Sequence, residues 1–370
     1  MTILSAITLA IISLLILFIL TKKRKEPSDY LLIIFNLFFI LTTLTDYETV
    51  NQSPSGLRVF LHFNVIFWLS TTLLIYSYSL QSGEKKIVLK WWFFTFSVPF
   101  FIFSFWDLLL NPAQTPETLQ AVIVEPGLIY HIFFKGHKLF IISVLFVLLK
   151  KINIYESGLR LSYSALDNIS LTWLKNYVVL IIIIYTLHLF FFLLYNFDVI
   201  TKIEIVYTIT GIPIVLGAFY LSYNGIKHYT NTHELSEEEV SIQKRSESAV
   251  RSKTSENASI FQKLETLFRE EQIYTDPELR IRDVAEEIDI PVHKLSEAIN
   301  EQFEKPFYDY VAFYRCELLK KKLIDPENAC FSILALGIDS GFNSKSSLNR
   351  IFKQQTGMTP SKFQKTSLPR

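Results

Sequence analysis

The chain has 370 residues, of which 50% are hydrophobic and only 19% are charged, and its mean hydropathy is +0.30. A soluble globular protein carries about 25% charged residues, so this composition excludes an ordinary soluble protein for most of the chain. The hydrophobic excess ends near residue 225, and the formal net charge of +1 is the cancellation of segments with opposite charge. The sequence therefore predicts a membrane-embedded N-terminal part and a soluble C-terminal part.

Seven hydrophobic runs precede residue 225. A helix needs about 20 apolar residues to cross about 30 Å of hydrocarbon, and each run approaches that length. The runs lie at residues 3–20, 30–46, 59–80, 91–110, 128–149, 177–197 and 203–224. We therefore predict an all-α protein in which residues 1–225 form a seven-helix transmembrane bundle that acts as a sensor.

The basic residues between these runs predict the orientation. Eleven Lys and Arg residues fall in the loops on one side, whereas the opposite loops contain only Arg58 and Lys202. Basic short loops stay in the cytoplasm, so we expect the N-terminus outside and the C-terminal part in the cytoplasm. Residues 22–25 follow the first run as a basic cluster, the reverse of the charge order of a secretion signal. The first run is therefore interpreted as an uncleaved span.

One basic cluster lies inside a predicted span. His131, Lys135 and Lys138 are spaced to share one face of the fifth run near its outer end. Ionisable residues within a span often mark a functional site, and these three would then bind a signal ligand outside the membrane. In the alternative interpretation, the long side chains reach the lipid headgroup layer. The sequence leaves both interpretations open and does not identify the ligand.

The C-terminal part begins after a polar stretch. Residues 226–259 are rich in Ser, Glu, Lys, Thr and Asn, which is typical of a flexible linker. Residues 260–370 then contain seven short amphipathic segments, and a helix-turn-helix pattern occurs twice, at 282–303 and 332–355. The two patterns are joined by a longer helix at about 307–323. A helix-turn-helix motif places its second helix in the major groove of DNA, so we expect two reading helices.

Three stretches of the C-terminal part form a recognisable signature. They are Gly341-Phe342-Asn343-Ser344-Lys345-Ser346-Ser347-Leu348-Asn349-Arg350-Ile351-Phe352-Lys353, then Gly357-Met358-Thr359-Pro360, and upstream Leu295-Ser296-Glu297-Ala298-Ile299-Asn300. Through them, about residues 262–366 resemble the AraC/XylS family of transcription regulators. The resemblance implies sequence-specific DNA binding and transcription control. Fusion to a multi-span half is similar to a membrane-bound subgroup in bacteria, which implies the inner (cytoplasmic) membrane. Gly337 stands where the family usually has Ala, and Leu348 where Phe is frequent.

The family's contact positions, carried over by the resemblance, give candidate DNA-binding residues in both reading helices. They are His293, Lys294, Ser296 and Glu297 in the first, and Asn343, Ser344, Lys345, Ser346, Ser347, Arg350 and Lys353 in and beside the second. Lys345 or Arg350 suits guanine O6 and N7 or a phosphate, and Glu297 suits cytosine N4. A solvated helix face is the ordinary alternative for each residue.

Charge divides the two motifs. Residues 260–304 contain five basic and twelve acidic residues, whereas residues 305–370 contain eleven basic and five acidic ones. Attraction to phosphate therefore belongs almost wholly to the second motif. We expect the second motif to anchor the domain on DNA. The first motif would read DNA weakly or contact a protein, such as RNA polymerase.

These patterns predict a membrane-bound one-component transcription regulator, controlled by a seven-span sensor. Its partners would be double-stranded promoter DNA, membrane lipid, a signal ligand and a second copy of the chain held through the spans. The alternative is a transporter or channel-like protein with a helix-turn-helix-derived protein-docking domain. The sequence contains no phosphate-binding Gly loop, HExxH or nucleophile elbow, so we predict no enzymatic activity and no cofactor. Cys316 and Cys330 lie in no metal-binding pattern, so we predict no metal site.

Overall fold

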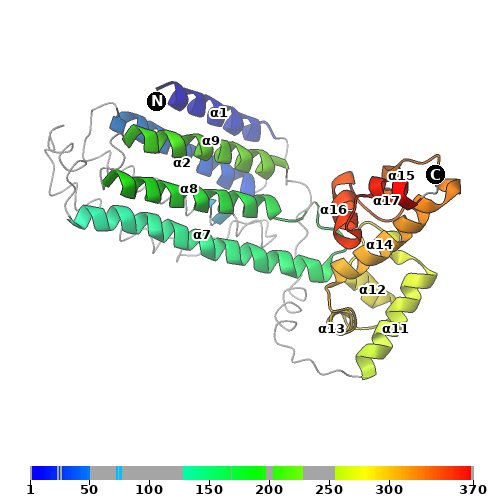
Figure 1. The fold of residues 1–370 in the computed structure, drawn as a ribbon. Coiled ribbons are helices and arrows are strands. Elements are labelled where there is room, and N and C mark those ends of the chain that lie inside the picture. The colour runs from blue at the N-terminus through cyan, green and yellow to red at the C-terminus, as the bar shows by residue number, and fades with distance from the viewer. Residues whose placement is uncertain are drawn as a thin grey trace. The chain divides into compact units, whose positions relative to one another are not determined.

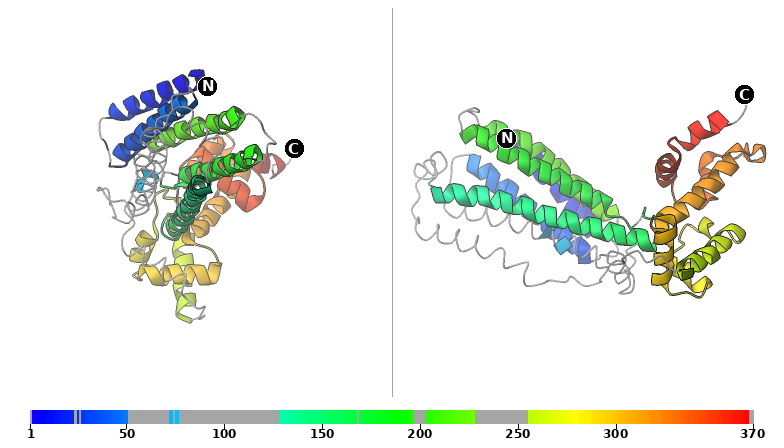
Figure 2. Two further views of the ribbon diagram at one scale, coloured as in Figure 1. Left: turned by 90° about the vertical axis from the view of Figure 1, so that its left-hand side faces the viewer. Right: turned by 60° about the horizontal axis from the view of Figure 1, so that its bottom comes forward.

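The structure is a computed structural model of the chain, shown in Figures 1 and 2. It describes residues 2–22, 25, 27–50, 72–73, 75–76, 128–167, 169–196, 203–227 and 255–367. These residues form twelve α-helices, two short 3₁₀ turns and one isolated antiparallel bridge, with no β-strand among them. The predicted all-α class is confirmed for this part of the chain.

Two compact units divide the chain. The N-terminal unit comprises Met1–Asn153 and Leu171–Glu234, and the C-terminal unit comprises Ile154–Ser170 and Leu235–Arg370. Residues 154–170 lie within the predicted membrane domain, 1–225, but cluster with the C-terminal unit.

The described part of the N-terminal unit consists of long helices. They are α1 (Thr2–Leu20), α2 (Pro27–Val50), α7 (Leu128–Ser162, as far as Asn153), α8 (Thr172–Asn196) and α9 (Ile203–Lys227). α1 packs on α2, α8 packs on α9, and α9 also contacts both α1 and α2 (Figure 1). Five of the seven predicted runs are therefore helical. The runs at 59–80 and 91–110 lie outside the described residues apart from four positions of the first.

One segment of α8 differs from the other described helices in its length and hydropathy. Among the described residues, Thr172–Phe191 is the one helical segment that is long and apolar enough, by length and composition, to cross a membrane. The apolar segments Ala6–Leu20 of α1 and Ser28–Leu41 of α2 are shorter. The seven-span bundle as a whole stays a prediction.

Polar side chains lie inside the N-terminal unit. Asn36 on α2 is fully buried, and its Nδ2 donates to the Leu32 carbonyl oxygen at 2.8 Å and to the Ser222 Oγ on α9 at 3.1 Å. Asp29 is also buried and pairs with the Nζ of Lys22 at 2.7 Å. Large apolar side chains are also exposed on this unit, and they include Leu14, Leu17, Phe18, Phe146, Phe190, Leu216 and Phe219. Apolar side chains therefore lie both in the interior and on the surface of the described helices.

The C-terminal unit has the seven helices that the sequence predicts. They are α11 (Ser255–Glu270), α12 (Ile281–Glu287), α13 (Val292–Phe303), α14 (Phe307–Ile324), α15 (Ile333–Ile338), α16 (Lys345–Thr356) and α17 (Pro360–Ser367). α12 and α13 form the first helix-turn-helix motif, and α15 and α16 form the second. α11 begins within the predicted linker, of which residues 228–254 lie outside the described part.

α14 contributes to two separate cores. Tyr310 and Val311 pack in the first core, together with α11, α12 and α13. Tyr308 and Leu319, on other faces of α14, pack in the second core with α15 and α16. With 18 residues α14 is about 27 Å long, so one helix supports both motifs.

The two motifs share a turn geometry. In the first, the Ile290 amide donates to the Ala285 carbonyl oxygen at 2.9 Å, and in the second the Phe342 amide donates to Gly337 at 3.1 Å. The residue before each of these amides has a positive φ, 54° at Asp289 and 93° at Gly341. Gly337 thus takes the position that Ala285 has in the first motif.

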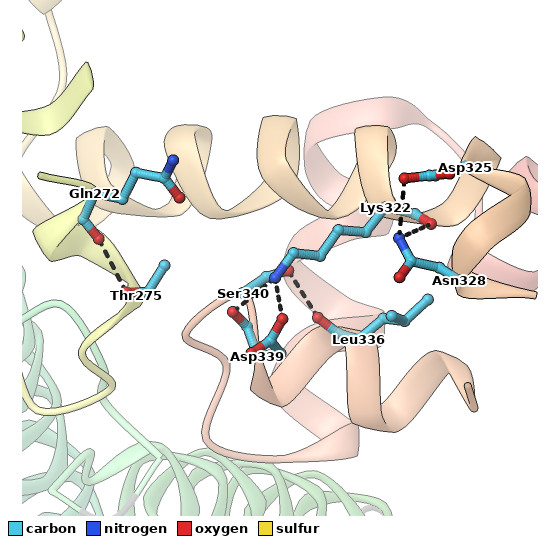
Figure 3. A network of polar contacts seen from close by, with 8 residues as sticks. All are labelled: Gln272, Thr275, Lys322, Asp325, Asn328, Leu336, Asp339 and Ser340. Carbon is cyan, nitrogen blue, oxygen red and sulfur yellow. Dashed lines mark hydrogen bonds and ion pairs between the residues drawn. The ribbon is translucent and has the colours of Figure 1, made fainter. Parts of the chain in front are cut away.

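Polar contacts fix the end of α14 to the second motif (Figure 3). Lys322 donates through Nζ to the Asp339 carbonyl oxygen at 3.0 Å and also pairs with the Asp339 carboxylate. Asn328 donates through Nδ2 to the Lys322 carbonyl oxygen at 3.2 Å. These contacts satisfy carbonyl groups at the C-terminal ends of α14 and α15, which would otherwise lack partners.

A buried arginine joins three segments of the C-terminal unit. Arg315 on α14 is only 2% exposed, and its guanidinium donates to the carbonyl oxygens of Tyr274 (2.7 Å), Asp276 (2.7 Å) and Ser164 (3.0 Å). Burial lowers the pKa of Arg315 to about 10, so the side chain remains charged at neutral pH. A Cβ at Gly341 would lie 2.6 Å from the Tyr274 carbonyl oxygen. The turn of the second motif therefore requires glycine here.

Candidate nucleic-acid interface

α16, the second helix of the second motif, has well-defined ends. The Oγ of Ser344 accepts a hydrogen bond from the Ser347 amide at 3.1 Å, which makes Ser344 the N-cap. Gly357 ends the helix with φ 77°, and its amide donates to the Lys353 carbonyl oxygen at 2.9 Å. These caps confirm that the helix runs from Lys345 to Thr356.

One face of α16 is exposed and basic. Lys345, Ser346, Arg350 and Lys353 are exposed, whereas Leu348, Ile351 and Phe352 are buried in the second core. The Nη2 of Arg350 donates to the Oη of Tyr308 on α14 at 3.0 Å. Apolar packing on one side thus directs the cations of α16 to the other.

α17 extends this positive charge. Lys362 and Lys365 on α17 are exposed. Neither these two lysines nor Lys345, Arg350 or Lys353 on α16 has a carboxylate partner among the residues that the structure describes. Two of the three lysines at the end of α14 differ, because Lys320 pairs with Glu317 and Lys322 with Asp339, whereas Lys321 is exposed and has no carboxylate partner among the described residues. Most of the exposed cations without a carboxylate partner in the described part of residues 305–370 therefore lie on α16 and α17, where they can attract DNA phosphates.

Two of the predicted contact residues are buried. Ser296 and Ser347 are each 4% exposed, and the Oγ of Ser347 donates to the carbonyl oxygen of Ser344 at 3.0 Å. Their hydroxyl groups face the interior of each motif, so neither is presented to a partner in this conformation. Asn343, by contrast, is exposed directly before the N-cap.

The first motif presents a different face. His293 and Lys294 on α13 are partly buried, and the Nζ of Lys294 pairs with the Oε2 of Glu256 on α11 at 3.2 Å. Glu297 is exposed and lies five residues into its helix from the first helical residue, as Arg350 does in α16. Where the second motif offers an arginine, the first therefore offers a carboxylate, as the unequal charge of the two motifs predicts.

Three predicted site residues have side chains outside the described part of the chain, and two residues that contact α16 were not predicted. His131, Lys135 and Lys138 fall within α7, but their side chains lie outside the described residues. Two residues that touch the reading helix were missed, namely Tyr308, which holds Arg350, and Asp167, whose Oδ2 accepts from the Oγ of Ser344 at 3.2 Å. Tyr308 lies in the resembling stretch without an assigned role. Asp167 gives no local signal, because it is 177 residues distant from its partner.

Parts of the chain are similar to a protein family and to a solved structure. Residues 284–366 match the model of a family described as a helix-turn-helix domain. A solved protein of unknown function from Listeria innocua is similar to 29% of this chain and 96% of its own, with 20% identity and a TM-score of 0.26. The chain has no match among curated proteins.

The matched range covers α12 from Val284 through α16 and most of α17. It contains the first motif from Val284 onward and the whole of the second motif. The match supports the helix-turn-helix part of the predicted resemblance, because residues 284–366 are similar to helix-turn-helix domains.

Proposed function

We propose that the chain is a membrane-bound one-component transcription regulator whose C-terminal unit binds promoter DNA sequence-specifically. The observation that carries the proposal is the set of exposed, unpaired cations on α16 and α17, displayed by a capped helix of a helix-turn-helix domain. A cation without an acidic partner is free to replace the counterions of DNA phosphates.

In this proposal the two motifs have unequal tasks. α16 enters the major groove, where Lys345 and Arg350 contact guanine or phosphate, and Lys353 and the lysines of α17 contact phosphates. α13 contributes less, because Lys294 is paired with Glu256 and Glu297 repels phosphate. The first motif then reads DNA weakly or contacts a protein such as RNA polymerase.

The membrane assignment is supported by the N-terminal unit. Its buried Asn36–Ser222 pair and its exposed Leu and Phe side chains suit a bundle surrounded by lipid, where polar groups must find partners inside. Thr172–Phe191 has the length and hydropathy of a span. The eleven-to-two bias of basic residues favours a multi-pass bacterial inner-membrane protein, with the C-terminal unit in the cytoplasm.

Sensing is the remaining part of the proposal. A signal, bound near His131, Lys135 and Lys138 or imposed by the membrane, would change DNA binding through the population of dimers formed by the spans. Crosslinking the full-length protein in membranes, with and without candidate signals, tests this route. An unchanged dimer yield would contradict it.

The decisive experiment is genome-wide capture of DNA with the full-length protein in its host. The test variant is Lys345→Ala/Arg350→Ala, which removes two cations from α16. A matched control, Lys263→Ala/Lys320→Ala, removes the same charge from an exposed position on α11 and from the Lys320–Glu317 pair on α14.

Discrete promoter peaks that persist in the control and vanish in the test variant would establish a DNA-binding regulator. Equal loss in both variants would indicate a general charge effect without reading by α16. No enrichment above a mock sample would favour the transporter or channel-like alternative with a protein-docking domain, and substrate flux in vesicles would then be measured.

A further inference from the structure

A short internal segment packs against both motifs of the C-terminal unit. Residues 154–170 comprise the last turns of α7 and the connection to α8, and they belong to the C-terminal unit. Leu161 packs against the first core and Leu166 against the second. We call residues 154–170 the strap.

Backbone contacts fix the register of the strap. Tyr163 forms an antiparallel bridge with Arg280, the residue before α12, and the Ser164 amide donates to the Leu279 carbonyl oxygen at 3.2 Å. Both the carbonyl oxygen and the Oγ of Ser164 accept from Arg315, each at 3.0 Å. Hydrogen bonds as well as apolar contacts therefore hold the strap against the rest of the C-terminal unit.

The strap also reaches the reading helix of the second motif. The Oδ2 of Asp167 accepts a hydrogen bond from the N-cap Ser344 at 3.2 Å. The guanidinium of Arg160 lies 5.3 Å from the ring centre of Tyr308, the same tyrosine that holds Arg350. Arg160 also pairs with Asp309, next to Tyr308, at 3.6 Å. The start of α16 and the position of Arg350 are thus both set by residues that the strap touches.

The charge of Asp167 opposes DNA binding at this place. The N-terminus of a helix attracts anions such as phosphate, and the exposed Asp167 carboxylate already lies there, hydrogen-bonded to the N-cap Ser344. A phosphate that approaches the start of α16 meets this negative charge first. Arg350 meanwhile is engaged by Tyr308.

We propose that the strap is an autoinhibitory element that, when docked on the helix-turn-helix domain, weakens its binding to DNA. The inference rests on the proposed DNA-binding function. The strap is continuous with α7 at one end and precedes α8 at the other, so a change in those helices that withdraws the strap would raise DNA affinity. The strap would then contact the helix-turn-helix domain in the low-affinity state and leave it in the high-affinity state. Coupling between two sites requires such a difference in contacts between two states.

A reversible disulfide tests the strap within one protein. Tyr163→Cys/Arg280→Cys is made in the full-length chain, in a background where Cys316→Ala and Cys330→Ser remove the natural thiols. Facing residues of an antiparallel bridge have Cβ atoms about 4.5–5.5 Å apart, which is near the range that a disulfide spans. Neither residue lies on α13 or α16, so both reading helices keep their sequence.

DNA affinity of the oxidised and reduced forms is then compared by fluorescence anisotropy in lipid nanodiscs. The probe is a random-sequence duplex of about 30 base pairs at about 50 mM salt, where attraction to phosphate is strong enough to measure. We expect the oxidised form to bind at least about tenfold more weakly than the reduced form.

Each outcome has a distinct meaning. Equal or tighter binding by the oxidised form overturns the inference while the proposed function stands. Failure of the disulfide to form also overturns it, because the docked strap would then not be populated. Absence of DNA binding in both forms contradicts the proposed function itself.

A charge variant provides an independent readout. Asp167→Asn keeps an oxygen that can accept from Ser344 but removes the carboxylate charge. We expect a several-fold gain in affinity for the same duplex, whereas Glu327→Gln, at an exposed acid in the turn after α14, should change it less than twofold. Equal gains in DNA affinity in the two variants would show that Asp167 does not inhibit DNA binding through its position at the start of α16.

Discussion

At the scale of single residues, two arginines of the C-terminal unit have opposite roles because of burial. Arg315 is 2% exposed, and its guanidinium donates to carbonyl oxygens of two other segments, Tyr274 and Asp276 in one and Ser164 in the other. Arg350 is exposed and has one neutral partner, the Tyr308 hydroxyl. A buried charge is tolerated only with such partners, so Arg315 holds the fold and Arg350 remains able to bind a ligand.

The two cysteines should react very differently with thiol reagents. Cys316 is buried in the second core, and burial raises the pKa of its thiol to about 12, whereas Cys330 is exposed. The raised pKa means that folding favours the protonated thiol, a stabilisation present below the unfolded pKa and lost as the pH rises through about 12. At pH 8, alkylation followed by peptide mass spectrometry should modify Cys330 within minutes and Cys316 only after unfolding. Equal labelling in the native protein would contradict the burial of Cys316.

Gly341 should tolerate substitution far less than Gly357, although both have positive φ. A Cβ at Gly341 would overlap the Tyr274 carbonyl oxygen and crowd Arg315, whereas a Cβ at Gly357 meets nothing within 4 Å. We expect Gly341→Ala to cost about 3 kcal/mol or more and Gly357→Ala about 1 kcal/mol. The urea concentration at which Cys316 becomes reactive measures both. Similar shifts for the two variants would show that φ alone matters.

At the scale of elements, α15 and α16 pack more closely than their sequences suggest. Gly337 on α15 lacks the methyl group that Ala285 has at the matching position of the first motif, and Leu348 on α16 fills that space. The glycine weakens a six-residue helix by up to about 1 kcal/mol, but it permits this contact. Gly337 and Leu348, which both depart from the pattern of the family that the sequence resembles, thus form a single packing contact.

Gly337→Ala should therefore destabilise the second motif despite its better helix propensity. The added Cβ would lie 1.7 Å from the present position of the Leu348 Cδ1, and Leu348 is 1% exposed. Overpacking costs about 1–3 kcal/mol, which exceeds the propensity gain. In a double-mutant cycle, Leu348→Val should recover at least about 1 kcal/mol in the Gly337→Ala background, measured by the same Cys316 exposure assay. Additive effects would refute the contact.

At the scale of the whole molecule, the two units differ in the side chains that they expose, although exposed apolar side chains occur in both. Exposed Leu14, Phe18 and Phe190 in the first unit suit lipid, whereas exposed Lys345 and Lys353 in the second suit water and DNA. The strap belongs to the second unit but is covalently continuous with helices of the first. The two units are therefore joined covalently at both ends of the strap as well as through the linker.

The predicted orientation can be tested with single cysteines in the background without natural thiols. Ser55→Cys falls between the second and third predicted runs, where basic residues are few, and should react with a membrane-impermeant maleimide in intact cells. Ser82→Cys falls between the third and fourth predicted runs, beside several lysines, and should react only after permeabilisation. The opposite result would invert the topology and move the helix-turn-helix domain out of the cytoplasm.

Sequence patterns alone predicted the helices and the charge distribution of the C-terminal unit. Hydrophobic periodicity predicted the seven helices of the C-terminal unit, and Ser332, Ser344 and Gly357 end helices there through contacts within a few residues. The resemblance predicted the second reading helix, and charge counts predicted the difference between the motifs. These properties depend on neighbouring residues or on sums of charge.

Only the folded structure shows the contacts between residues that are distant in the sequence. Whether Ser347 faces the interior, whether Lys294 is free, and which arginine is buried follow from packing partners that no local pattern encodes. The strap is the clearest case, because Ser164 and Arg315 are 151 residues apart and Asp167 and Ser344 are 177 apart. Such contacts form only when folding brings the segments together, and with them the structure converts a predicted loop into an element that controls the DNA-binding domain in our proposal.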